Sequence, residues 1–204
     1  MKTLRPTQEE MKKRIARFKE LKPRSANLQA KTGIPMEVIR MLNPKANYVL
    51  MAPDDLPGVL SVNPEVNGGH EGILRVGMAL CAPGDGPGLH VHWKTHETFM
   101  ALSGKWRIDW GDEGEEHVIL EPFDMIAVPP KVTRQFINVS DKDAHLLVLI
   151  QGEKEDFNDV GRPAKAADAI IAKYGPEMIE KLEQAGWKFR LDANAPTEEE
   201  EAQA

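Results

Sequence analysis

Short hydrophobic runs separated by turn-forming residues dominate the middle of this chain. After Gly72 the runs read ILRVGMALCA, ETFMALS, KWRIDW, HVIL, MIAVP, RQFINV and AHLLVLI, and the spacers between them include GDGPG, GDEGEE and SDKD. Short apolar or alternating runs at such close spacing are typical of the strands of a β-sandwich or a small barrel. Because no internal repeat is visible, the pattern predicts a mainly β fold with a single barrel.

Both ends of the chain change to helical periodicity. Thr7 and Glu10 have the spacing of a capping box, and the apolar positions that follow predict a first helix over residues 8–21. Further helices are expected over residues 35–42, 164–174 and 176–185, whereas residues 48–69 are rich in loop-forming residues. The predicted organisation is an N-terminal helical extension at 1–47, a β-barrel at 48–152, C-terminal helices at 153–190 and a disordered acidic tail at 191–204.

Composition narrows the class of protein. The chain has 204 residues, a formal net charge of -6 and a single cysteine, Cys81, which excludes an intramolecular disulfide and agrees with a reducing compartment. The N-terminus has no apolar stretch long enough for a secretory signal, and no run of about 18 apolar residues occurs, so we expect a cytoplasmic protein without a membrane span. The acidic balance argues against nucleic acid as the main partner. The basic face of the first predicted helix is either a solvated surface or a DNA-binding arm, and it comprises Lys12, Lys13, Arg14, Arg17 and Lys19.

Two histidines and a glutamate are the strongest candidates for chemistry. His90 and His92 are two residues apart in a predicted strand, so their side chains share a face and lie about 7 Å apart along it. Glu97 follows five residues later, on the next predicted strand. Two imidazoles and one carboxylate on one side suit a divalent transition metal that keeps open coordination positions. The alternatives are a pair of buried core histidines and an ordinary ion pair for Glu97, although a carboxylate inside a barrel is costly unless it is paired or coordinated.

These residues belong to a pattern that resembles the first motif of the cupin superfamily. That motif is a glycine, five residues, His-x-His, three or four residues, a glutamate, six residues and a glycine, and it is matched by Gly84, His90, His92, Glu97 and Gly104. The second motif is matched in part, by Asp124, Pro129 and Asn138. Its two glycines are replaced here by Phe123 and Lys131, and its histidine, usually the fourth metal ligand, is replaced by Arg134. The resemblance covers roughly residues 70–152 and implies a single cupin-type β-barrel or jelly roll.

Arg134 is the departure with the largest consequence. A protonated guanidinium cannot bind a metal, and the resemblance implies that the side chain points inward. In one interpretation Arg134 binds an anionic group of a substrate beside a metal held by His90, His92 and Glu97, since its planar fork matches a carboxylate or an enolate. In the other, Arg134 forms a salt bridge with Glu97 in a barrel that has lost its metal. His96 is expected to point away from Glu97, and surface or packing roles are expected for His70, His117 and His145.

The superfamily that this chain resembles includes oxygenases, isomerases, decarboxylases, lyases and non-catalytic binding proteins, so fold alone does not decide the activity. We expect a metal-dependent enzyme that acts on a small oxygenated, anionic organic substrate, with Fe(II) favoured and Mn, Ni, Cu or Zn possible. A dioxygenase is the leading reaction type, because two histidines and one carboxylate leave adjacent positions for substrate and O₂. A redox-neutral isomerase or lyase and a non-catalytic small-molecule sensor are the alternatives. The apolar stripes of the terminal helices predict a homodimer.

Overall fold

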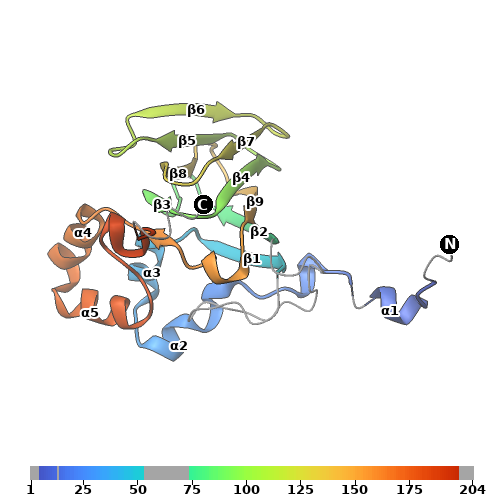
Figure 1. The fold of residues 1–204 in the computed structure, drawn as a ribbon, viewed down its shortest axis with the longest axis horizontal. Coiled ribbons are helices and arrows are strands. Elements are labelled where there is room, and N and C mark those ends of the chain that lie inside the picture. Colours follow the sequence, from blue (N-terminus) through green and yellow to red (C-terminus); the bar gives the residue numbers. More distant parts are fainter. Residues whose placement is uncertain (1–4, 13, 53–73, 198–204) are drawn as a thin grey trace.

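The computed structural model describes residues 5–12, 14–52 and 74–197, and these form two antiparallel β-sheets with helices at both ends (Figure 1). The first sheet has the strand order β1-β2-β9-β4-β7 and the second the order β10-β3-β8-β5-β6. The strands are β1 Ala46–Met51, β2 Leu74–Cys81, β3 His90–His92, β4 His96–Ala101, β5 Trp106–Trp110, β6 Glu116–Leu120, β7 Met125–Val128, β8 Thr133–Asn138, β9 Ala144–Gln151 and β10 Val160–Gly161.

The main core lies between the two sheets. Alternate residues of each strand point into it, as the period of two requires. Phe99 of the first sheet meets Phe136 of the second with ring centroids 5.2 Å apart, and Trp106 packs on the same Phe136 ring. The arrangement is the predicted jelly roll, mainly β, although strand pairing among the described residues does not close the two sheets into a barrel.

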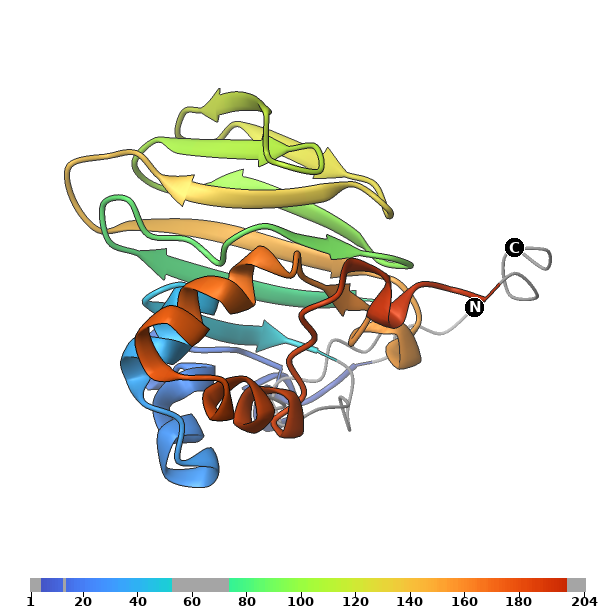
Figure 2. The same ribbon diagram turned by 90° about the vertical axis from the view of Figure 1, so that its left-hand side faces the viewer.

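A second, smaller core joins the two ends of the chain (Figure 2). The helices are α1 Gln8–Lys12, α2 Leu28–Thr32, α3 Met36–Leu42, α4 Lys165–Tyr174 and α5 Glu177–Gln184. Apolar residues of α3, such as Val38 and Leu42, pack with Ile170 of α4 and Leu182 of α5. The helices predicted over residues 35–42, 164–174 and 176–185 are therefore present, and their apolar sides cover one another within a single chain.

The first helix is shorter than predicted. The capping box is present, because Glu10 accepts a hydrogen bond from the Thr7 backbone N–H and its own N–H donates to Thr7 Oγ1. However, α1 ends at Lys12, and the chain then forms only a single turn of 3₁₀ helix at Phe18–Glu20. No residue of α1 is buried. A short helix without tertiary contacts is marginal in water, which explains why the apolar period alone did not extend it.

The first residues of the tail that was predicted to be disordered form regular structure instead. Leu191–Asn194 form a 3₁₀ helix in the region expected to be a disordered tail. The carbonyl oxygen of Leu191 accepts a hydrogen bond from Trp93 Nε1, and the side-chain amide of Asn194 donates one to the carbonyl oxygen of Val160 in β10. Residues 198–204 of that predicted tail lie outside the described residues.

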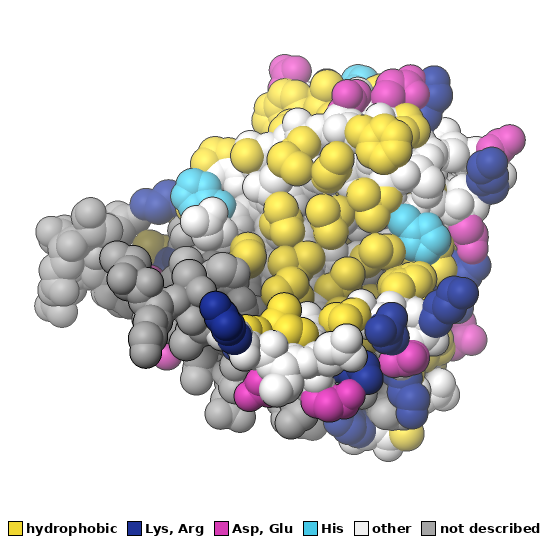
Figure 3. All heavy atoms as spheres, turned by 90° about the vertical axis from the view of Figure 1, so that its right-hand side faces the viewer, with side chains coloured by type: hydrophobic (Ala, Val, Ile, Leu, Met, Phe, Trp, Pro, Cys, Tyr) yellow, Lys and Arg dark blue, Asp and Glu magenta, His cyan; other side chains and the backbone are white. Residues whose placement is uncertain are grey.

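The outer face of the first sheet is apolar (Figure 3). Strand register places one row of side chains straight across it, from β1 to β7, namely Tyr48, Met78, Leu147, Met100 and Met125. Met125 is 54% exposed. This outer face therefore presents apolar side chains that nothing in the described chain covers completely, whereas the apolar sides of α3, α4 and α5 cover one another. None of the described helices has the length and apolar composition needed to cross a membrane.

Candidate metal centre

Strand β3 presents both candidate histidines to the space between the sheets. It pairs with β8 on one side and β10 on the other, and both His90 and His92 are buried. The loop that leads into β3 passes very close to β8, because a Cβ atom at Gly86 would lie 1.9 Å from the carbonyl oxygen of Phe136. Only glycine permits that approach. The GDGPG spacer therefore sets the position from which the two histidines enter the site.

Glu97 reaches the same point from the neighbouring strand β4. Its Oε2 atom lies 3.6 Å from Nε2 of His90 and 3.6 Å from Nε2 of His92. The three candidate ligand atoms lie within 4.8 Å of one another, and all three side chains are buried. The structure thus brings together the three residues that the sequence proposed as metal ligands.

Hydrogen bonds on the far side of each imidazole leave both Nε2 atoms available. His90 Nδ1 donates to the carbonyl oxygen of Gly88 at 2.9 Å, and His92 Nδ1 donates to Oδ1 of Asp159 at 2.7 Å. A carbonyl oxygen and a carboxylate can only accept, so each ring carries its proton on Nδ1 and a lone pair on Nε2. This is the tautomer that a histidine ligand needs.

Asp159 is held in place by its own set of donors. Its Oδ2 atom accepts hydrogen bonds from the backbone N–H groups of Lys94 and Thr95, at 2.8 and 2.7 Å, and the Thr95 hydroxyl donates to the same carboxylate. Sequence analysis missed this residue. It lies 67 positions after His92 and outside both motifs, so no local pattern relates it to the site.

The charge states of His90 and Glu97 suit a metal. Burial lowers the pKa of His90, which favours the neutral imidazole at neutral pH. Burial by itself raises the pKa of the Glu97 carboxyl, but His92, His90 and Arg134 around it outweigh that effect and hold its pKa below the ordinary value. A neutral imidazole and an ionised carboxylate are the forms that bind metal ions.

Arg134 lies directly behind this group. It pairs with His90 across β3 and β8, is 0% exposed, and its Nε atom lies 3.8 Å from Oε2 of Glu97. Its Nη2 atom donates to the carbonyl oxygen of Pro129 at 2.9 Å. Arg134 is not among the described residues that line the cavity above the site. Contact with a substrate therefore remains a prediction for this residue.

The remaining histidines stay apart from the centre. His96 and His117 are exposed, and His145 is partly buried with its ring 5.7 Å from that of Phe18. His70 lies outside the described residues. The two residues that replace the expected glycines, Phe123 and Lys131, adopt positive φ angles of 76° and 67° and so keep the backbone conformation of glycine.

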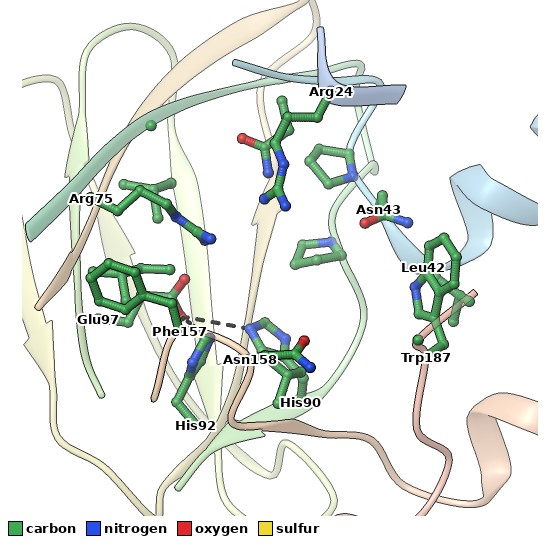
Figure 4. A pocket seen from close by; sticks show the side chains of 18 of the residues that line it. Arg24, Leu42, Asn43, Arg75, His90, His92, Glu97, Phe157, Asn158 and Trp187 are labelled. Carbon is green, nitrogen blue, oxygen red and sulfur yellow. Dashed lines mark ion pairs between the residues drawn. The ribbon is translucent and has the colours of Figure 1, made fainter. Parts of the chain in front are cut away.

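A cavity of about 220 Å³ opens above the three candidate ligands (Figure 4). His90, His92 and Glu97 form part of its wall, and aromatic side chains such as Phe157 and Trp187 form another part. Three arginines also line it, namely Arg24, Arg75 and Arg162. Sequence analysis did not select any of these three, since each belongs to a different segment.

The residues fit a divalent metal ion. Two ligand atoms that are each about 2.1 Å from one metal lie roughly 3.0 to 3.5 Å apart, close to the 3.6 Å between Oε2 of Glu97 and Nε2 of each histidine. The Oε2 atom of Glu97 is buried and makes no hydrogen bond among the described residues. Leaving such an atom without a partner costs about 1–3 kcal/mol, whereas a metal would satisfy it.

The fold and the centre together define a double-sheet β protein with a buried His-His-Glu group that can hold a metal. Residues 77–150 match the model of the cupin domain, and this part of the chain is a cupin domain. That match confirms the resemblance drawn from the sequence motifs. No curated protein is similar enough to the chain to count as a relative.

Several solved structures resemble the chain in part. The structures of the DMSP lyases RdDddP and RnDddQII match with 20% identity and a TM-score of 0.41, over 52% of this chain and 47% of that one. The Bacillus halodurans protein BH2720 matches with 16% identity and a TM-score of 0.37, over 39% and 62%. A predicted oxalate decarboxylase of Thermotoga maritima matches with 19% identity and a TM-score of 0.35, over 38% and 64%. Each match spans less than two thirds of the other chain, and likeness at this level says nothing about activity.

Proposed function

We propose that this chain is a metal-dependent cupin enzyme that acts on a small, oxygenated, anionic organic substrate, and that its reaction is a dioxygenation. The observation that carries the proposal is the buried group of His90, His92 and Glu97 on the wall of a cavity that arginines also line. Two histidines and one carboxylate suit Fe(II), the favoured ion, and Mn, Ni, Cu or Zn are also compatible with these ligands. The predicted cytoplasmic location is part of the same proposal.

The chain's own residues would divide the work as follows. His90 and His92 would hold the ion through Nε2, with Asp159 and the Gly88 carbonyl fixing the two rings. A bound divalent ion would supply open coordination positions for substrate oxygens, and iron would also allow the substrate to be oxidised by O₂. Arg134 would keep Glu97 ionised and oriented, and the arginines of the cavity would bind the anionic part of the substrate.

A redox-neutral isomerase or lyase is the second candidate, and the arginines favour it equally. Guanidinium groups placed near a substrate carbonyl stabilise the oxyanion that forms when a neighbouring carbon loses a proton. The metal would then act only as a Lewis acid. A sensor that binds a small molecule without catalysis would use the same cavity, but it would not require the ion.

Metal analysis of the purified protein tests the proposal. We expect about one equivalent of a divalent transition metal per chain, and we expect His90→Ala and His92→Ala each to lose it while the protein stays folded. His96→Ala is the matched control, because this exposed histidine lies on β4 next to Glu97 but outside the centre. Unchanged metal content in the double variant His90→Ala/His92→Ala would remove the proposed centre. Oxygen uptake with candidate substrates would then separate a dioxygenase from a redox-neutral enzyme.

A further inference from the structure

The arginines of the cavity come from three separate parts of the fold. Arg24 begins the 3₁₀ helix Arg24–Asn27, Arg75 lies on β2, and Arg162 follows β10 directly. All three line the cavity together with His90, His92 and Glu97. The side chains of Arg24 and Arg75 both extend into the cavity and approach each other there (Figure 4).

Strand register explains why Arg75 faces the metal centre. Arg75 pairs with Ile150 on β9, and Ile150 pairs in turn with Glu97 on β4. Arg75 and Glu97 therefore share one face of the sheet, two strands or about 10 Å apart, which the long arginine side chain can largely bridge. The Arg75 guanidinium also lies over the ring of Phe157, 6.0 Å from its centroid.

Register also places Arg162 next to the centre. In the antiparallel pairing of β10 with β3, Val160 is opposite His92 and Gly161 is opposite Val91. The next residue, Arg162, therefore follows on the side of His90, and Val160 and Arg162 both line the cavity. The Nε atom of Arg162 is buried and makes no hydrogen bond among the described residues.

The wall carries an excess of positive charge. Burial and the nearby charge of Arg75 lower the pKa of Arg24 to about 9, and burial lowers the pKa of Arg162 to about 10. Both groups thus stay protonated at neutral pH. Glu97 is the one carboxylate among the described residues that line the cavity, so Arg75, Arg162 and a divalent metal would together face one anion there. A ligand with two negative charges would offset this imbalance.

No α-helix among the described residues presents its N-terminus to the cavity. Both α3 and α5 touch the cavity at their C-terminal ends, through Leu42 and Gln184. Phosphate groups are bound preferentially at helix N-termini, where backbone N–H groups point outward, whereas helix C-termini disfavour any anion, so the arginines must supply the attraction here. A cavity of 220 Å³ equals roughly seven water volumes. It therefore suits a ligand of about eight to ten non-hydrogen atoms, the size of a dicarboxylate with four to six carbons.

We propose that this cavity binds a small dicarboxylate, with one carboxylate between Arg24 and Arg75 and the other beside the metal centre at Arg162. Planar guanidinium groups match carboxylates in two-pronged fashion. The carbon chain of the ligand would lie against Phe157 and Trp187. This assignment rests on the proposed function in that it names the substrate class of the same site.

Calorimetric titration with succinate and butyrate tests the assignment. The full-length protein is used with its metal, and again after the metal has been removed by a chelator and the chelator by gel filtration. Succinate is expected to bind at least about tenfold more tightly than butyrate, which has the same carbon chain with one carboxylate, because a second charge-assisted contact is made. Arg24→Met, Arg75→Met and Arg162→Met should each reduce succinate affinity about tenfold or more and leave the metal content unchanged. Arg190→Met is the control, since Arg190 is exposed and pairs with Asp192.

The outcomes separate this inference from the proposed enzyme. Preference for succinate in a protein that takes up no metal supports the dicarboxylate site and rejects the metal-dependent function. Equal binding of succinate and butyrate by a protein that holds its metal overturns the dicarboxylate site and leaves the enzyme proposal standing. Inorganic phosphate that competes as strongly as succinate would also overturn it. These comparisons use the parent protein, so they decide the question even if an arginine variant fails to fold.

Discussion

Replacement of Asp159 by asparagine removes the partner that orients His92 while keeping the size of the side chain. One carboxylate oxygen of Asp159 faces His92 Nδ1 at 2.7 Å, and the other accepts from the backbone N–H groups of Lys94 and Thr95. An asparagine has only one acceptor oxygen. If that oxygen stays with the two backbone donors, its amide nitrogen faces His92 Nδ1 and donates to it, which moves the imidazole proton to Nε2. The protonated Nε2 can then no longer bind a metal.

The expected loss follows from that change of tautomer. Removing a carboxylate partner from a metal-binding histidine typically weakens metal affinity about 10- to 100-fold. That range corresponds to roughly 1.4 to 2.7 kcal/mol. The opposite amide orientation leaves the two backbone N–H groups facing an NH₂ group, which costs about 1–3 kcal/mol of folding stability instead. Asp159→Asn is therefore expected to lower metal affinity, thermal stability or both.

Competition with a chromophoric chelator would measure the metal affinity, and thermal melting of the metal-free protein would measure stability. Asp156→Asn is the matched control, because Asp156 lies in the same segment and pairs with Lys94 Nζ at 3.4 Å without touching His92. It removes the same charge three residues away and should leave metal affinity unchanged. If Asp159→Asn bound the metal as tightly as the parent and melted at the same temperature, the orienting role of Asp159 would be refuted.

Three shorter predictions concern Arg134 at the position of the family's fourth ligand, the strained turn at Phe123, and the outer face of the first sheet. Arg134→His should restore the fourth ligand of the family and tighten metal binding, measured by the same chelator competition, and Arg134→Ala should keep the metal. If the parent instead holds no metal and Arg134→Ala destabilises it, Arg134 forms a salt bridge with Glu97. Phe123→Gly should raise the free energy of unfolding by about 0.5–1 kcal/mol in urea, because Phe123 has φ 76° and is 72% exposed, whereas Phe123→Ala should give no gain. Light scattering at about 50 μM should give the mass of a homodimer. Met100→Glu, on the outer sheet face, should reduce that mass to a monomer, whereas Ile171→Glu, on the exposed side of α4, should leave it unchanged. A monomeric parent would contradict the dimer.

The sequence determined the part of the site that depends on local spacing. His90 and His92 share a face because a strand alternates its side chains, and Glu97 joins them because β4 follows β3 after a short turn. The same short-range patterns predicted the helices near residues 35–42 and 164–185, where an apolar side finds a partner. The first predicted helix was wrong in length, since no residue of α1 is buried and an apolar period without tertiary contacts does not sustain a helix.

Tertiary structure alone decided what surrounds the candidate metal centre. Asp159 meets His92 only because β10 returns to pair with β3, and Arg24, Arg75 and Arg162 meet only because the N-terminal segment, β2 and the chain after β10 border one cavity. Such contacts depend on strand order and loop paths, which local hydrophobic periodicity does not encode. The sequence weakly indicates that Arg75 points inward, because the alternate residues Gly77, Ala79 and Cys81 on the same face of β2 are small and leave space there. The candidate metal ligands could thus be predicted from the sequence, whereas the charge of the cavity depended on how distant segments pack together.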